Sequence, residues 1–113
     1  MTSLLAVVET DLYGAQAAKL MNEAERFAVV TAVAAAPTMG VLIKGTKGLR
    51  KMRIPLQGRG KRGGGRVVYW FHSDGYPVVL LMVYAKNAAS DLTNEQRNRL
   101  VAISETLLDD FGD

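Results

Sequence analysis

Hydrophobic and polar positions repeat with a period of about two in several stretches of the chain, which indicates β-strands. Residues 3–9 form a short apolar run and predict an N-terminal strand. Residues 49–54 alternate, residues 66–72 are rich in β-branched and aromatic side chains, and residues 77–84 are almost continuously apolar. Turn residues separate these last three stretches, at Gly58–Gly65 and at Ser73–Gly75. We therefore predict a three-stranded antiparallel meander.

Apolar residues at three- and four-residue intervals predict three helices. The first covers residues 11–21, and Asp11 is a possible N-cap. The second follows Asn22 as its cap, packs through Phe27, Val30, Val33 and Ala34, and ends near Ala36 before Pro37. The last begins where Thr93 and Gln96 have capping-box spacing and continues to about Phe111.

The predicted order is strand, two helices, three antiparallel strands and a helix, which is an α+β fold with helices against one sheet. A chain of 113 residues has the size of one domain, so residues 1–113 are assigned to a single domain. The opening apolar run is too short to span a membrane and lacks the features of a secretion signal. With no cysteine in the chain, a cytoplasmic location is expected.

Charge is unevenly distributed along the chain. The formal net charge is only +3, yet no Asp or Glu occurs between Glu25 and Asp74. That interval contains 10 of the 14 basic residues: Arg26, Lys44, Lys47, Arg50, Lys51, Arg53, Arg59, Lys61, Arg62 and Arg66. A charge run is usually a solvated face, but without counter-charges the cations repel one another. An anionic partner such as nucleic acid would relieve that repulsion.

The segment Gly58–Gly63 has the G-x-G-x-x-G spacing of dinucleotide-binding turns, but a strand follows it where that motif requires a helix. We interpret it as a glycine-rich loop whose Arg59, Lys61 and Arg62 bind phosphates. The single histidine, His72, excludes a multi-histidine metal site, and no cofactor is expected. Among the strand aromatics, Trp70 shares a face with Arg66 and is a candidate for base stacking, although core packing is the commoner use of such a ring.

Four motifs in this order resemble the HigB branch of the RelE toxin superfamily, and the similarity extends from the opening strand to about Leu100. The motifs are Gly48-Leu49-Arg50-Lys51-Met52-Arg53, the segment Gly58–Gly64, Arg66-Val67-Val68-Tyr69, and Tyr84-Ala85-Lys86-Asn87 continuing to Asp91-Leu92-Thr93. The resemblance implies a RelE-like fold, a compact sheet with helices on one side. It also implies cleavage of messenger RNA on the ribosome by a toxin of a type II toxin–antitoxin module.

The resemblance further implies a helix-turn-helix antitoxin of the HigA kind that masks the basic face and links the toxin indirectly to operator DNA. It matches Lys51, Arg53, Arg66 and Lys86 to the family's catalytic cations. Because clustered cations disfavour one another's charge, Lys51 or Lys86 is nominated as general base, and Arg53 and Arg66 as stabilisers of the transition state. Other residues would bind RNA: Lys47, Arg50, Arg59, Lys61, Arg62 and Trp70.

One departure from the family pattern bears on activity, because Ala88 stands where an acidic residue is expected after Lys86-Asn87. Two alternatives stay open beside cleavage of messenger RNA. One is a ParE-like toxin that acts on DNA gyrase without cutting RNA, and the other, suggested by Ala88, is an inactive relative that only binds RNA or its antitoxin.

Overall fold

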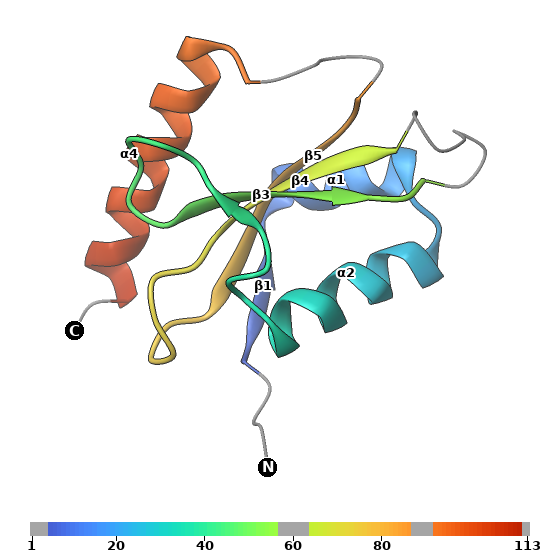
Figure 1. Cartoon of the computed structure of the whole chain (residues 1–113), viewed down its shortest axis with the longest axis horizontal. Coiled ribbons are helices and arrows are strands. Elements are labelled where there is room, and N and C mark those ends of the chain that lie inside the picture. Colours follow the sequence, from blue (N-terminus) through green and yellow to red (C-terminus); the bar gives the residue numbers. More distant parts are fainter. Residues whose placement is uncertain (1–4, 57–63, 87–91, 112–113) are drawn as a thin grey trace.

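The computed structural model describes residues 5–56, 64–86 and 92–111 and contains, in that part, three helices and a mixed five-stranded sheet (Figure 1). The strand order across the sheet is β1-β5-β4-β3-β2. The elements are β1 (Val7–Glu9), α1 (Asp11–Leu20), α2 (Glu23–Ala35), β2 (Val41–Leu42), β3 (Leu49–Ile54), β4 (Gly65–Trp70), β5 (Val78–Ala85) and α4 (Asn94–Phe111).

The predicted meander is confirmed, since β3, β4 and β5 pair antiparallel in sequence order. β1 joins the sheet parallel to β5, after the chain has passed through α1 and α2. The strand β2 was not predicted, because two residues carry no measurable periodicity. It pairs with β3 through Val41–Lys51 and Leu42–Arg50 and extends the sheet beyond the meander.

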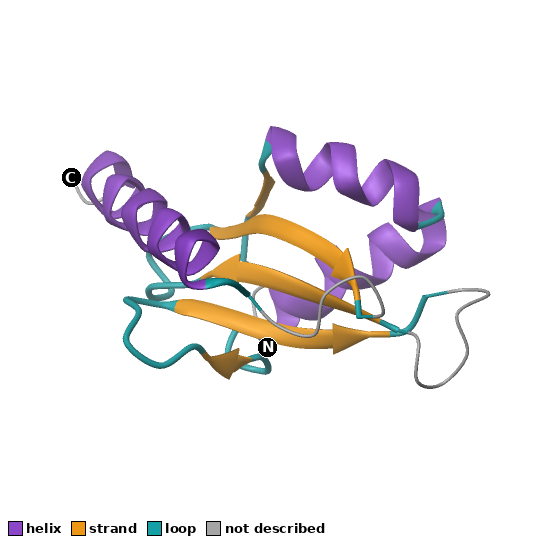
Figure 2. Ribbon diagram, turned by 90° about the horizontal axis from the view of Figure 1, so that it is seen from above, coloured by secondary structure: helices purple, strands orange, loops and turns teal. Residues whose placement is uncertain are grey.

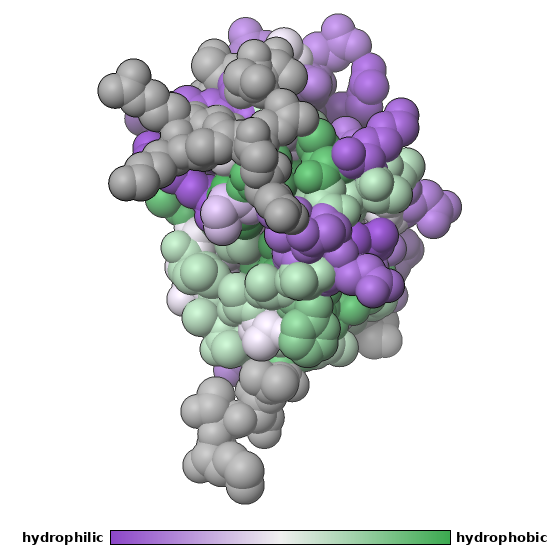
Figure 3. Space-filling model, turned by 90° about the vertical axis from the view of Figure 1, so that its right-hand side faces the viewer, coloured by the Kyte–Doolittle hydropathy of each residue, from purple (hydrophilic) through white to green (hydrophobic). Residues whose placement is uncertain are grey.

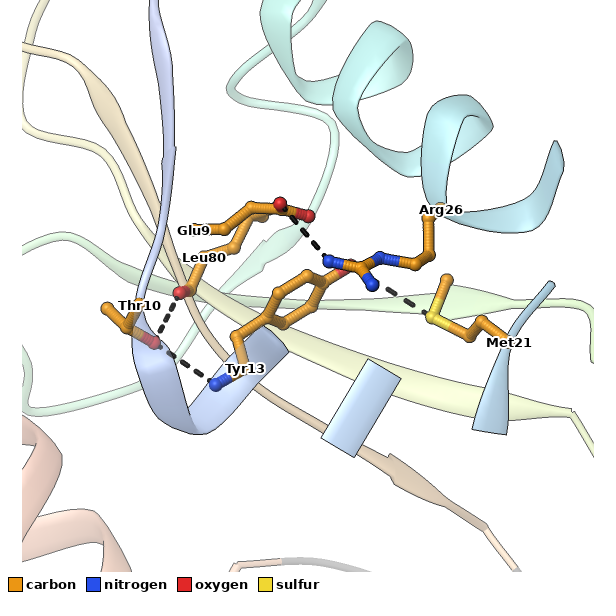
Figure 4. Close-up of polar contacts among 6 residues, drawn as sticks. All are labelled: Glu9, Thr10, Tyr13, Met21, Arg26 and Leu80. Carbon is orange, nitrogen blue, oxygen red and sulfur yellow. Dashed lines mark hydrogen bonds and ion pairs between the residues drawn. The ribbon is translucent and has the colours of Figure 1, made fainter. Parts of the chain in front are cut away.

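The helix starts are fixed by side-chain caps. Asn22 caps α2 as predicted, in a capping box with Glu25. The predicted cap Asp11 is wrong, because Thr10 performs this role for α1: its hydroxyl accepts a hydrogen bond from the Tyr13 amide (Figure 4). The same hydroxyl donates to the Leu80 carbonyl at 2.9 Å. One threonine therefore starts α1 and ties it to the central strand.

The helices cover both faces of the sheet, which corrects the expectation that they lie on one side. The first face, covered by α1 and α2, buries Tyr13, Val33, Val67 and Tyr69 among others. The second face, covered by α4, buries Leu49, Val68, Trp70 and Leu100 among others. Figure 2 shows α4, beside the C-terminus, apart from the other two helices. No helix of the described residues is long and apolar enough to cross a membrane.

The turn before β3 depends on glycine. Gly45 and Gly48 have φ angles of 79° and 100°, values that favour glycine over other residues. A Cβ on Gly48 would also lie 2.6 Å from the Phe71 carbonyl oxygen. The Phe71 amide donates to the Gly48 carbonyl at 2.9 Å, so the turn is attached to the end of β4 and sets the register of the β3–β4 pair.

Candidate nucleic-acid interface

Two arginines lie directly opposite each other on neighbouring strands. Arg53 of β3 pairs with Arg66 of β4, and Arg66 pairs on its other side with Tyr84 of β5. Antiparallel pairs alternate between hydrogen-bonded and non-hydrogen-bonded forms. Counting from the hydrogen-bonded Gly48–Phe71 pair makes Arg53–Arg66 a non-hydrogen-bonded pair, in which side chains are closest. We name Arg53, Arg66 and Tyr84 the arginine row.

The arginine row has no counter-charge among the described residues. Like charges directly opposite each other in a sheet are destabilising. The ion pairs found between described residues join Arg26 to Glu9 and Arg99 to Glu95, and both lie elsewhere. Arg66 donates a hydrogen bond to the carbonyl of its neighbour Gly65 at 3.1 Å. The Arg53 side chain is exposed and Arg66 is half-buried, so an anion from solvent can reach both.

The other two predicted catalytic cations lie on or beside the same region. Lys51 is two residues from Arg53 on β3, so it shares the second face of the sheet and is half-buried. The Lys86 amide donates to the Gly64 carbonyl at 3.1 Å, which places Lys86 at the end of the β4–β5 pair, next to the arginine row. Lys86 is exposed. The fold thus brings Lys51, Arg53, Arg66 and Lys86 to one end of the second face.

Arg50 is separated from these cations. It alternates with Lys51 along β3 and therefore lies on the first face. Its guanidinium donates to the carbonyls of Gly40 at 2.8 Å and Thr38 at 3.3 Å, in the connection between α2 and β2. Arg50 thus holds a loop of the protein, and this placement does not support its predicted contact with RNA.

The predicted stacking of a base on Trp70 needs correction. Trp70 does share the second face with Arg66, but its side chain is 0% exposed and lies in the core beneath α4. Its indole N–H donates to the Lys47 carbonyl at 3.1 Å. The ring is therefore a packing residue that fixes the turn before β3. The Lys47 side chain, in contrast, is exposed beside that turn.

Several predicted positions fall outside the described residues: Arg59, Lys61, Arg62 and Ala88. His72 is described and exposed, and its ring lies edge-on to Tyr76, with centroids 4.5 Å apart. No group of three or more His, Cys, Asp or Glu side chains that could hold a metal ion occurs in the described part of the chain.

Tyr84 was not predicted as a site residue, although it is the first residue of the fourth motif. Its position beside Arg66 depends on the pairing of β4 with β5. That pairing contains a register shift after Val68, and Leu81 has no partner on β4. The signal that would have found Tyr84 is a correct alignment of the two strands, which periodicity alone does not provide.

A second surface of different character lies over α2. Phe27 was predicted to pack inward, but its side chain is 73% exposed. Figure 3 views the side of the molecule on which this helix lies and shows a broad apolar area below a hydrophilic band. A groove of about 490 Å³ separates α2 from β3, and its apolar lining includes Ala24, Ala28, Met39 and Ile54. The helix is apolar on nearly all sides, so periodicity did not identify the buried side.

No family model matches this chain.

Proposed function

We propose that this chain is a RelE/HigB-type toxin, an endoribonuclease that cuts messenger RNA on the ribosome. The observation that carries the proposal is the arginine row. Arg53 and Arg66 lie directly opposite each other with no carboxylate partner in the described residues, and both are accessible to solvent. Two opposed cations destabilise the sheet through their repulsion, and a bound phosphate removes that repulsion.

The proposed fold family is RelE-like. In its support, a parallel N-terminal strand joins an antiparallel meander, with two helices between them along the chain. The motif resemblance extends over the same elements. The helix arrangement differs from the family expectation in placing α4 on the second face.

The proposed reaction is attack of a ribose 2′-hydroxyl on the adjacent phosphorus. The new O–P bond forms as the bond to the 5′-oxygen breaks, which leaves a 2′,3′-cyclic phosphate and a 5′-hydroxyl. A base accepts the 2′-hydroxyl proton and an acid donates a proton to the departing 5′-oxygen. We assign the base to Lys51 or Lys86 and the phosphorane charge to Arg53 and Arg66, whose guanidinium groups stay charged. Tyr84 belongs to the same row, but its hydroxyl is buried, so we assign it no role in proton transfer.

The proposed partners follow from the charge and from the apolar surface. The glycine-loop cations and Lys47 would hold the RNA or ribosomal backbone, since phosphate contacts supply most non-specific affinity. An antitoxin of the HigA kind would cover the basic face in the cytoplasm and connect the toxin to operator DNA. The apolar area over α2 is a second surface on which such a protein can bury area.

The test is primer extension on a translated messenger after brief induction of the wild type, Arg66→Ala and, as a matched control, Arg99→Ala. The Arg99 side chain is 70% exposed on α4 and pairs only with Glu95 in the described residues. We expect cuts with the wild type and Arg99→Ala, and none with Arg66→Ala. Growth arrest with intact messenger would favour gyrase, and no arrest at all would favour an inactive relative; either result contradicts the proposal.

A further inference from the structure

A second cationic site lies next to the arginine row. A pocket of about 360 Å³ opens between the β2–β3 edge and the start of α4. Three cations line it, Lys44, Lys51 and Arg97, and no carboxylate of the described residues does. Its remaining lining is mostly apolar, from Val41, Leu42, Ile43 and Leu92, with Asn94 at the rim. The pocket therefore has an apolar wall against which a flat ring can pack, and cations that can bind an anion.

Lys51 joins this pocket to the arginine row. It lines the pocket and stands two residues before Arg53 on the same face of β3. Two residues along a strand correspond to roughly 6.8 Å. A polyanion bound at Arg53 and Arg66 can therefore continue past Lys51 into the pocket without leaving the surface.

Arg97 is held in position for an incoming anion. Its guanidinium donates to the Lys44 carbonyl, which uses one of the five donors of the group. Gly45 makes room for it, since a Cβ at that position would collide with the Arg97 guanidinium. The first turn of α4 is satisfied by its own capping box between Thr93 and Gln96. The anion site consequently consists of the side chains of Lys44 and Arg97.

We propose that this pocket binds the nucleotide next to the cleaved phosphodiester in single-stranded RNA. The phosphate of that nucleotide lies on Lys44 and Arg97, and its base packs against the apolar wall around Leu42. An apolar wall accepts the flat face of any base, and the cations accept any phosphate. The inference rests on the proposed function for its ligand, and it adds Lys44 and Arg97, which lie outside the four motifs.

The experiment measures binding without cleavage. A fluorescein-labelled hexauridylate with 2′-O-methyl riboses lacks the attacking hydroxyl, and its anisotropy reports affinity for the full chain at several salt concentrations. Lys44→Gln and the double variant Lys44→Gln/Arg97→Gln are compared with Lys19→Gln. Lys19 is an exposed lysine at the end of α1 and serves as the matched control.

We expect affinity to fall about fivefold in Lys44→Gln and at least tenfold in the double variant, since each substitution removes a cation that binds phosphate. The slope of log K against log salt is negative and should become less negative by about 0.7 for each phosphate that is no longer neutralised. Lys19→Gln should bind like the wild type. Circular dichroism checks that the variants are folded, and Lys44→Gln keeps the test valid if loss of Arg97 disturbs the β2–β3 turn.

Equal affinity and slope in wild type, Lys44→Gln and the double variant would overturn the pocket, even if the wild type cuts messenger RNA. A pocket-dependent loss of affinity in a wild type that cuts no RNA would support the pocket and contradict the proposed cleavage. The two proposals therefore fail in different assays.

Discussion

The arginines on the two faces of the sheet differ in their bonding partners. On the first face, Arg50 and Tyr69 are used by the protein itself: Arg50 donates to the Gly40 and Thr38 carbonyls, and the Tyr69 hydroxyl accepts from the Gly40 amide and donates to the Pro37 carbonyl. On the second face, Arg53 and Arg66 oppose each other with no counter-charge in the described residues.

Within the single strand β3, one arginine therefore has a structural role and another is available for function. Arg50 and Arg53 both belong to β3 and to the same basic stretch, yet alternation sends them to opposite faces. Arg50 donates to two carbonyls of the α2–β2 connection, whereas Arg53 and Arg66 have no carboxylate partner in the described residues and can bind an anion from outside. Substitutions on the first face should therefore change stability, and substitutions on the second face should change activity.

The largest effect is expected in the arginine row. Arg53→Ala and Arg66→Ala should each slow messenger cleavage by about 100- to 1,000-fold, because each removes a charged donor from the developing phosphorane. The two groups act on one phosphate, so the double variant should be impaired much less than the product of the two single effects. Single-turnover cleavage rates of the four proteins measure this coupling. Two independent effects that multiply would contradict a shared phosphate.

A smaller effect, on stability alone, is expected at Tyr69. Tyr69→Phe leaves the Gly40 amide and the Pro37 carbonyl without their partner and should lower the free energy of unfolding by about 1–3 kcal/mol. Tyr76→Phe is the control, since the Tyr76 hydroxyl makes no hydrogen bond within the described residues. Urea unfolding provides both values. A Tyr69→Phe protein that is as stable as wild type would contradict the claim that the polar groups of the first face stabilise the fold.

The first face should also give the protein a pH-dependent stability in the alkaline range. Burial raises the pKa of Tyr13 to about 12, with the Glu9 carboxylate adding to the shift and Arg26 opposing it (Figure 4). The neutral phenol is thus favoured in the folded state, so its contribution is complete below pH 10 and is lost as the pH rises toward 12.

The corresponding measurement is urea unfolding at pH 10 and pH 11 for wild type and Tyr13→Phe. Between these values the wild type should lose about 1 kcal/mol more than the variant. An equal loss in both proteins would show that Tyr13 ionises as readily in the folded chain as in the unfolded one.

The smallest effect is a gain of stability on the second face. Arg53→Gln removes one of two opposed cations and should raise the free energy of unfolding by about 0.2–1 kcal/mol. Arg99→Gln removes an exposed pair with Glu95 and should lower it slightly or leave it unchanged. Urea unfolding at low salt compares the two. A destabilised Arg53→Gln protein would mean that Arg53 has a structural role.

The elements with a regular pattern could be predicted, and those without one could not. Alternation gave the bounds of β3 correctly. It gave no indication of β2, whose two residues form a strand only because β3 lies beside them. Phe27 was assigned to the wrong side because α2 is apolar on nearly all sides.

The candidate site shows the same limit. Lys51, Arg53 and Arg66 were nominated from the motifs, and the structure places all three on the second face of the sheet. The opposition of Arg53 and Arg66 and the position of Tyr84 depend on strand register, which long-range pairing decides. Trp70 was placed on the correct face but was expected to be accessible. The ring is buried because α4 covers that end of the sheet, and nothing local in the strand indicates this cover.

The central claim is that the arginine row cuts RNA, and the most direct test uses purified ribosomes programmed with a messenger. The wild type is added with and without ribosomes, and the new RNA ends are mapped and identified. We predict cuts that require ribosomes, carry a 2′,3′-cyclic phosphate and a 5′-hydroxyl, and disappear in Arg66→Ala. Intact messenger with the wild type, or equal cutting by wild type and Arg66→Ala, would contradict the claim.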